Sequence, residues 1–208
     1  MPPRGGKSEI ASKNFPAWTL GKHPEWEFIN CSYAASLAEG FSRECRDLIK
    51  SQGYANVFSH TRLNKDAQGV EEWRTAVVDN GVGLVGGGGF VAAGVGGPIT
   101  GKGAHILTID DPFKNDEEAD SVLQQEKVWN WYQSTAMSRL SPGGGILIIQ
   151  TCWNWNDLVG RLLKAAREDP DADQWEVARY AAINEGYDEY QDITTRALIR
   201  IPVHQEIP

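Results

Sequence analysis

The sequence contains no long hydrophobic run, few cysteines and no excess of positive charge. No segment approaches the roughly 20 apolar residues that a membrane-spanning helix needs, and the amino terminus lacks the apolar core of a signal peptide. These absences predict a cytoplasmic protein that does not enter a membrane.

Residues that form disulfides or bind transition metals are also sparse. Cys31, Cys45 and Cys152 are odd in number and far apart, which fits neither a disulfide framework nor a zinc site. The histidines are scattered, without a pair four residues apart or a neighbouring cysteine. A transition-metal site is therefore disfavoured, and Mg²⁺ is the metal that we expect.

The net charge of −8 argues against a domain that is itself a continuous nucleic-acid-binding surface, although it allows local basic contacts. The composition, 41% apolar and 23% charged, is that of an ordinary globular protein. A chain of 208 residues can form one α/β domain. Such a domain buries roughly 70% of its unfolded surface.

A short apolar segment that ends in two acids is the most informative stretch. Positions 106–109 (ILTI) precede Asp110 and Asp111, which indicates a buried strand with carboxylates at its carboxyl end. Ligands of open α/β sheets bind outside that end, where two acids can hold a cation and polarise a water. An ordinary Asp-Asp-Pro turn after a strand explains the segment equally well.

A motif at the amino terminus favours the first interpretation. The tripeptide GKS at 6–8 matches the end of the phosphate-binding pattern GxxxxGK[ST], although the first glycine of that pattern falls on Met1. In this pattern backbone N–H groups surround phosphates, the lysine reaches the β- and γ-oxygens, and the hydroxyl binds Mg²⁺. The tripeptide alone is a weak signal, but together with the acid-ended strand it indicates a nucleoside triphosphatase.

The remaining hydrophobic patterns predict alternating helices and strands. We expect a helix of about two turns from Lys7 that Pro16 shortens, a helix that opens at a capping box at 36–39 and ends at Gly53, and a turn at 142–145. The other expected elements are a strand at 27–32, a hairpin around 79–81, a helix at 121–140, a strand at 146–151 and a helix at 156–167.

Two of these segments bear on function. The strand at 146–151 has the most clearly buried pattern and ends in Gln150 and Thr151, whose side chains would lie beside a γ-phosphate and report its hydrolysis. Polar residues that simply begin a loop are the alternative. The glycine-rich run at 86–89 indicates either close backbone packing or a mobile element.

Five segments occur in a recognisable order: PPRGGKSE, FPAW, GVGGPITGKGAHILTIDDPFKNDEEADS, WNWYQSTAMSRLSPGG and IIQTCWNWNDLVGRLL. In this order they resemble the ATPase domain of the tailed-phage terminase large subunit, the DNA-packaging motor, as far as about Ala181. The resemblance implies an α/β fold of the P-loop NTPase (ASCE/RecA-like) type, with a mostly parallel sheet flanked by helices. It also implies hydrolysis of ATP with Mg²⁺, coupled to translocation of double-stranded DNA into a prohead.

The same resemblance implies partners and a location. The family works as a homo-oligomeric ring docked on the portal protein, together with the terminase small subunit, in the host cell cytoplasm. Some branches of the family carry an arginine at the position of Thr100 that would act on a neighbouring subunit. In this chain such a residue must lie elsewhere, and Lys102 and Arg139 are the candidates.

The resemblance also implies roles for individual residues. It assigns the nucleotide phosphates to Arg4, Gly5, Gly6, Lys7 and Ser8, Mg²⁺ to Ser8 and Asp110, catalysis to Asp111 and Arg4, and coupling to Gln150 and Thr151. Arg4 suits its role because a guanidinium fork matches phosphate oxygens. Asp111 stands where the family places the carboxylate that activates water.

Several positions depart from the family pattern. Asp111 is one methylene shorter than the Glu of many ATPases. Either the attacking water lies closer to the carboxylate, or Glu117 or Glu118 shares the role of activating it. Cys152 and Asn154 replace an Arg and a His of the usual block after the coupling residues.

The expected domains are an ATPase domain at 1–181, without the strand that precedes the phosphate loop, and at 182–208 the start of a linker towards a nuclease domain that this chain lacks. No cluster of nuclease acids is visible, so we expect no DNA cleavage. Two hypotheses remain open. The intact Lys7 and Asp111 favour a motor ATPase, whereas the missing strand favours a non-catalytic remnant or assembly module that keeps the fold but not turnover.

Overall fold

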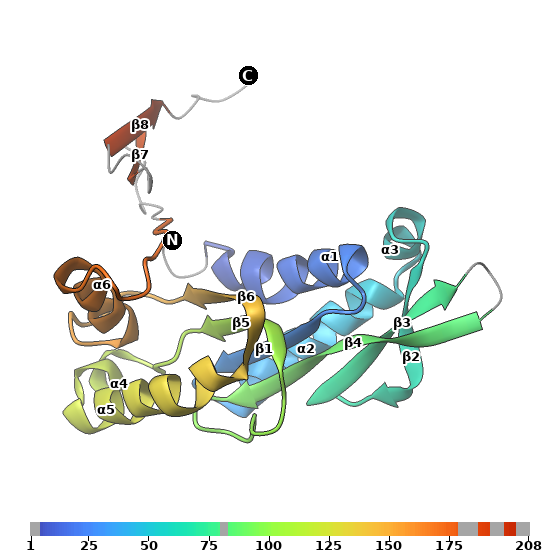
Figure 1. The fold of residues 1–208 in the computed structure, drawn as a ribbon, viewed down its shortest axis with the longest axis horizontal. Helices are drawn as coiled ribbons and strands as arrows, with labels where there is room; N and C mark the ends of the chain where they lie inside the picture. Colours follow the sequence, from blue (N-terminus) through green and yellow to red (C-terminus); the bar gives the residue numbers. More distant parts are fainter. Residues whose placement is uncertain (1–4, 80–82, 179–186, 192–197, 203–208) are drawn as a thin grey trace.

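The computed structural model describes residues 5–79, 83–178, 187–191 and 198–202 (Figure 1). Six strands form one sheet in the order β2-β3-β4-β1-β5-β6. Their bounds are β1 (Glu27–Ser32), β2 (Thr61–Gln68), β3 (Glu72–Asp79), β4 (Gly83–Gly94), β5 (Ala104–Asp110) and β6 (Leu140–Ile149). Two further strands, β7 (Tyr187–Gln191) and β8 (Leu198–Pro202), pair only with each other among the described strands.

The helices lie on both faces of the sheet. They are α1 (Phe15–Lys22), α2 (Ala35–Lys50), α3 (Gln52–Val57), α4 (Asp116–Asp120), α5 (Val122–Trp131) and α6 (Leu158–Glu168). Two π-helical segments, η1 (Glu9–Asn14) and η2 (Tyr132–Ala136), and a 3₁₀ turn, η3 (Met137–Arg139), extend the first and fifth of them. Figure 1 shows α4, α5 and α6 grouped at the end of the molecule opposite α3 and the β2–β3 strands. The expected α/β fold is confirmed.

The sheet is parallel where the candidate site lies and antiparallel elsewhere. β1 pairs in parallel with β4 and β5, and β5 pairs in parallel with β6, whereas β2, β3 and β4 are joined by antiparallel pairs. The register sets Ser32 beside Asp110 and Asp110 beside Ile149. The carboxyl ends of β1, β5 and β6 therefore meet at one edge, where ligands of such sheets bind.

The two faces of β5 are chemically different. Leu107 and Ile109 belong to the hydrophobic core that includes residues of α5 and α6. Because side chains alternate along a strand, Thr108 and Asp110 face the other side, where η1, α1 and α2 pack. The strand thus presents its last acid to the helical segment that follows the GKS tripeptide.

Trp73 anchors the core on the α2 side of the sheet. Its side chain is 0% exposed, its ring stacks on Phe90 with centroids 5.2 Å apart, and its Nε1 donates to Ser42 Oγ at 2.9 Å. We expect Trp73→Ala to lower the free energy of unfolding by about 3–5 kcal/mol, because it removes a buried ring. Trp155→Ala, at a side chain 87% exposed, is expected to change it by less than about 0.5 kcal/mol. Urea unfolding that gave both variants the same stability would contradict this packing.

The glycine run in β4 serves close backbone packing. A Cβ added to Gly88 would lie 1.7 Å from the backbone oxygen of Trp26. The backbone N–H groups of Gly88 and Gly89 donate to Pro24 O and Trp26 O at 2.6 and 3.0 Å. This segment is therefore held by neighbouring backbone, which decides between the two interpretations of the run.

Predictions about the boundaries of two helices were wrong. Pro16 does not shorten the first helix: it stands near the start of α1, where its missing N–H costs little, and the helix continues to Lys22. The capping box at 36–39 is not used, since α2 begins at Ala35 without a side-chain cap. Gly53 lies inside α3 rather than ending α2, which stops at Lys50.

The prediction that the strand at 146–151 is the most buried one was also wrong. β6 is an edge strand in the described sheet, and Ile146 to Ile149 are all half-buried. The turn expected at 142–145 lies within β6, as an irregular stretch with a positive φ of 77° at Gly143. An apolar sequence alone cannot separate an edge strand from a central one, because both are apolar where one face packs on a core.

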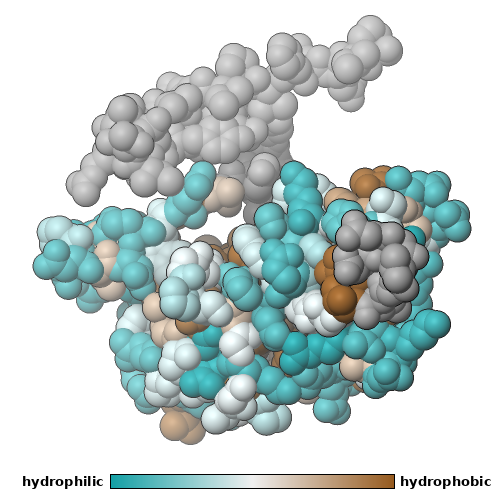
Figure 2. Space-filling model, turned by 45° about the vertical axis from the view of Figure 1, so that its right-hand side comes forward, coloured by the Kyte–Doolittle hydropathy of each residue, from teal (hydrophilic) through white to brown (hydrophobic). Residues whose placement is uncertain are grey.

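Exposed hydrophobic side chains are dispersed. The face that Figure 2 presents is mainly hydrophilic, with hydrophobic residues in small groups. Among the described residues, no helix combines the length and apolar character needed to cross a membrane.

Candidate functional site

The GKS tripeptide forms a turn that leads directly into the first helical segment. Gly6 has a φ of +80°, a conformation that side-chain-bearing residues rarely adopt, and its carbonyl accepts a hydrogen bond from Ile10 N at 3.0 Å. Lys7 and Ser8 are the first helical residues. The start of this helix therefore presents backbone N–H groups, as an anion site requires.

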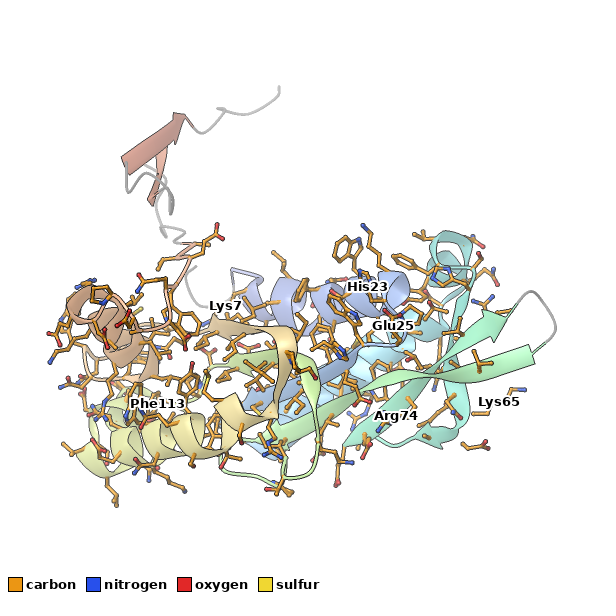
Figure 3. All side chains as sticks on the ribbon, viewed as in Figure 1. Lys7, His23, Glu25, Lys65, Arg74 and Phe113 are labelled. Atoms are coloured by element: carbon orange, nitrogen blue, oxygen red, sulfur yellow. The ribbon has the colours of Figure 1, made fainter. Side chains whose placement is uncertain are left out.

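Lys7 joins the tripeptide to the ends of two strands (Figure 3). Its Nζ donates to Asp111 Oδ1 and to Thr151 Oγ1, each at 2.9 Å. The Lys7 side chain is 10% exposed and that of Asp111 is 31% exposed. The Asp111 end of the ion pair is thus more open to solvent than the Lys7 end.

Asp111 is held in an unusual backbone conformation. Its φ of +45° is left-handed, which is uncommon for a residue other than glycine. Backbone hydrogen bonds fix it from both sides: its N–H donates to Ile149 O at 2.7 Å and its carbonyl accepts from Tyr33 N at 3.1 Å. Thr151 N also donates to Asp111 Oδ1 at 3.1 Å. A strained backbone conformation that is held in place by several surrounding hydrogen bonds is typical of functional positions.

Asp110 lies deeper, under the first helical segment. Its side chain is 1% exposed, and its Oδ2 accepts a hydrogen bond from Ser12 Oγ at 2.6 Å. Its Oδ1 is buried and has no partner among the described residues. Burial raises the pKa of this carboxyl, while the hydrogen bond from Ser12 and the nearby Ser8 hydroxyl oppose the rise and the neighbouring Asp111 adds to it. A buried carboxylate with one unpaired oxygen fits a site for a cation.

The raised pKa of Asp110 makes folding stability depend on pH. Between the unfolded value and the higher folded value, the folded state binds more protons, so stability falls as pH rises through this range. We expect Asp110→Asn, which removes the charge but keeps an oxygen for Ser12, to be more stable than wild type at neutral pH without Mg²⁺. The advantage should vanish as the pH falls below 3.8, the ordinary value of the group. Urea unfolding in EDTA across this range measures the difference, and a deficit at every pH would contradict the assignment.

The structure brings together most, but not all, of the residues singled out in the sequence. Lys7, Asp111 and Thr151 are in direct contact, and Asp110 lies beside Asp111. Gln150 is not part of this contact: its side-chain amide is buried without a partner in the described part of the chain. Gly5 is exposed. Arg4 lies outside the described residues.

The alternative acids do not lie in this network. Glu118 Oε2 accepts from Lys114 N at 3.0 Å, which keeps it at the start of α4. Glu117 is exposed in the first turn of the same helix. Cys152 is exposed, and Asn154 Nδ2 donates to Asp120 Oδ1 at 2.6 Å. Asp111 is therefore the carboxylate in contact with Lys7.

The two basic residues considered for a neighbouring subunit differ in their contacts. Lys102 Nζ donates to Glu72 Oε2 at 2.6 Å, so it is already paired. Arg139 donates only to Ser138 Oγ among the described contacts. Of the two, Lys102 is paired with a carboxylate, whereas Arg139 has no partner of opposite charge among the described contacts.

Ser12 is the residue of this site that the sequence analysis missed. It is 0% exposed and its hydroxyl is hydrogen-bonded to Asp110. It follows Ser8 by four positions, a spacing that sets two side chains on one face of a helix. That spacing is the signal that could have identified it.

A metal site made by protein groups alone is absent here: no group of three or more His, Cys, Asp or Glu side chains able to hold a metal occurs among the described residues. Mg²⁺ does not need such a group, because it usually keeps several waters and binds through one or two carboxylates plus substrate phosphates. Ser8 and Asp110 are the residues able to hold such an ion.

Comparisons with known proteins identify the family. The family model for the N-terminal part of the terminase large subunit, T4-like-virus type, matches residues 1–199. The chain therefore belongs to this terminase family, which confirms the resemblance read from the five segments. A search of curated proteins found no match.

Solved structures of large terminases are similar at low identity. The ATPase domain of the Thermus phage P74-26 large terminase is 18% identical, with a TM-score of 0.48, over 74% of this chain and 59% of that chain. The HK97 bacteriophage large terminase is 13% identical, with a TM-score of 0.49, over 87% of this chain and 35% of that chain. The chain thus spans about three-fifths of the first protein and about a third of the second.

Proposed function

We propose that this chain is the ATPase part of a viral DNA-packaging motor, which hydrolyses ATP with Mg²⁺ to drive double-stranded DNA into a prohead. The observation that carries the proposal is the contact of Lys7 with both Asp111 and Thr151, residues more than 100 positions away in the sequence. It joins a phosphate-binding lysine, a carboxylate and a strand-end hydroxyl at one sheet edge. Membership of the terminase family supports the same function.

The lysine contact suggests how nucleotide would act. A γ-phosphate at the start of the first helical segment would compete with Asp111 for the Lys7 ammonium. Asp111 would then be free to accept a hydrogen bond from the attacking water. Gly5, Gly6 and Arg4 would complete the phosphate site, with Ser8 and Asp110 holding Mg²⁺. The bound ion neutralises the charge that develops on the phosphate oxygens.

We infer that Thr151 would couple hydrolysis to movement. Its hydroxyl accepts from Lys7, and its backbone N–H donates to Asp111. When Lys7 turns to a phosphate, Thr151 loses one of these two contacts, and it regains the contact when the phosphate leaves. Gln150, the other coupling residue, would act through its buried amide. The end of β6 would thus report the state of the nucleotide.

Assembly is the remaining part of the proposal. We infer a homo-oligomeric ring that contacts double-stranded DNA, the portal protein and the terminase small subunit in the host cytoplasm. Residues 1–181 would form the ATPase domain and 182–208 would lead out of it. In support, α6, which ends at Glu168, is the last helix or strand around the main sheet in the described part of the chain.

Steady-state ATP hydrolysis by the purified chain tests the proposed function. We expect turnover that requires Mg²⁺, is abolished by EDTA and rises when double-stranded DNA is added. Binding of Mg²⁺·ATP without turnover, with or without DNA, would instead favour the non-catalytic assembly module. Absence of both binding and turnover would overturn the ATPase proposal for this chain.

A further inference from the structure

Ser12 makes the shortest hydrogen bond of the candidate site. Its Oγ donates to Asp110 Oδ2 at 2.6 Å, and both side chains are fully or almost fully buried. The two residues are 98 positions apart in the sequence, so the bond links η1 to the end of β5. Nothing in the GKS tripeptide requires a hydroxyl at this position.

The bond leaves the two carboxylate oxygens of Asp110 unequal. Oδ2 is occupied by Ser12, whereas Oδ1 is buried without a partner among the described residues. Ser32 lies beside Asp110 in the β1–β5 register, and its buried Oγ is also without a described partner. Two unpaired oxygens therefore occupy neighbouring positions on one face of the sheet, as the inner side of a hydrated cation site requires.

We propose that Ser12 is a positioning residue that fixes the Asp110 carboxylate with Oδ1 directed to Mg²⁺; this inference rests on the proposed function, in which the site takes a magnesium nucleotide. Ligating carboxylates are commonly oriented by hydrogen bonds from a surrounding shell of residues, and loss of such a partner weakens metal binding. Without Ser12, Asp110 is free to rotate about its Cβ–Cγ bond and has two buried oxygens to satisfy.

The arrangement also explains why a second hydroxyl is needed beside Ser8. Ser8 also favours the ionised Asp110 carboxylate and so lowers its pKa, but the side-chain hydrogen bond that Asp110 accepts in the described part of the chain comes from Ser12. The Ser8 oxygen is the one assigned to Mg²⁺, whereas the Ser12 hydroxyl is bonded to the carboxylate before any ion binds. Ser12, one turn further along and shielded from solvent, keeps Asp110 in place in both states.

Magnesium titrations of nucleotide binding test this role. For wild type and variants, ADP affinity is measured by calorimetry in EDTA and at increasing Mg²⁺ concentration. Ser12→Ala is expected to raise the Mg²⁺ concentration for half-maximal effect by about 10–100-fold. It should leave the affinity for ADP in EDTA unchanged, because the phosphate loop is intact.

Two sets of controls separate positioning from mere packing. Ser12→Thr keeps the hydroxyl and Ser12→Val removes it at nearly equal volume, so Thr should resemble wild type and Val should resemble Ala. Ser42→Ala removes another fully buried serine, whose partner is Trp73 on the far part of the sheet, and should lower stability without altering the Mg²⁺ requirement. If both larger side chains prevent folding, the comparison of Ser12→Ala with Ser42→Ala decides.

The outcomes distinguish this inference from the proposed function. An unchanged Mg²⁺ requirement in Ser12→Ala, while wild type shows a clear one, would overturn the role of Ser12 and leave the ATPase proposal standing. If wild-type binding of ADP shows no response to Mg²⁺, the magnesium nucleotide site itself is wrong, and the role of Ser12 is overturned with it.

Discussion

Lys7→Ala is expected to lower Mg²⁺-dependent ATP turnover by about 10²–10³-fold, the usual cost of removing one group that stabilises transition-state charge. The reason is geometric as well as electrostatic. The Lys7 side chain is 10% exposed, and its Nζ lies 2.9 Å from both Asp111 Oδ1 and Thr151 Oγ1, so its charge already lies at the end of the sheet before nucleotide binds. Steady-state hydrolysis and nucleotide affinity should be measured together.

Lys65→Ala is the matched control, since Lys65 is an exposed lysine on β2, far from Lys7 in Figure 3. It should hydrolyse ATP like wild type. If the two alanine variants lose activity to the same degree, or if neither does, the assignment of the phosphate-binding lysine is refuted.

Asp111→Asn is expected to lower turnover by about 10²–10⁴-fold, the range that general acid–base catalysis contributes, and to keep nucleotide affinity. Asparagine tolerates the left-handed φ of +45° at this position almost as well as aspartate, so the backbone should not change. The amide oxygen can still accept hydrogen bonds from Lys7 and from Thr151 N. What is lost is the negative charge that we propose activates the attacking water.

Asp66→Asn serves as the control, because Asp66 is exposed on β2 and takes no part in the site. A fall in turnover for Asp111→Asn with unchanged ADP affinity identifies a chemical role. A parallel loss of affinity would show that Asp111 instead builds the binding site. Wild-type turnover in Asp111→Asn would move the catalytic carboxylate elsewhere, to Glu117 or Glu118.

The parts of the fold that the sequence predicted are those with a strong local pattern. The strand at 27–32 is β1, the acid-ended strand is β5, and the hairpin expected around 79–81 joins β3 and β4, with residues 80–82 outside the described ones. The segment at 61–68 was missed as a strand: β2 is polar and lies at the sheet edge, so it carries little of the alternation that marks a strand.

What the sequence could not give is the order of strands across the sheet. The position of β6 at an edge follows from its pairing with β5 alone, and that pairing depends on contacts between segments far apart in the chain. The shape of the first helical segment could not be predicted either. Its π-helical part, η1, precedes Pro16 and packs on β5 and α2, and local helix propensity does not encode such packing.

The site was predictable where chemistry dictates residue type. Lys7, Asp110, Asp111 and Thr151 were identified from motifs, and the structure sets Lys7 in contact with Asp111 and Thr151. Ser12 belongs to no motif, because its role arises only when η1 packs on the end of β5. The role of Gln150 stays a prediction, since its amide is buried without a partner among the described residues.

Binding of Mg²⁺·ATP to the purified chain tests the central claim most directly. Thermal unfolding is followed at increasing ATP concentration, with Mg²⁺ and with EDTA, for wild type and Lys7→Ala. We predict stabilisation that grows with the logarithm of ATP concentration above the dissociation constant and reaches about 2.7 kcal/mol at 100 times that constant. It should require Mg²⁺ for its full size and disappear in Lys7→Ala. Equal stabilisation of both proteins, or none in wild type, would contradict a magnesium nucleotide site at Lys7, Asp110 and Asp111.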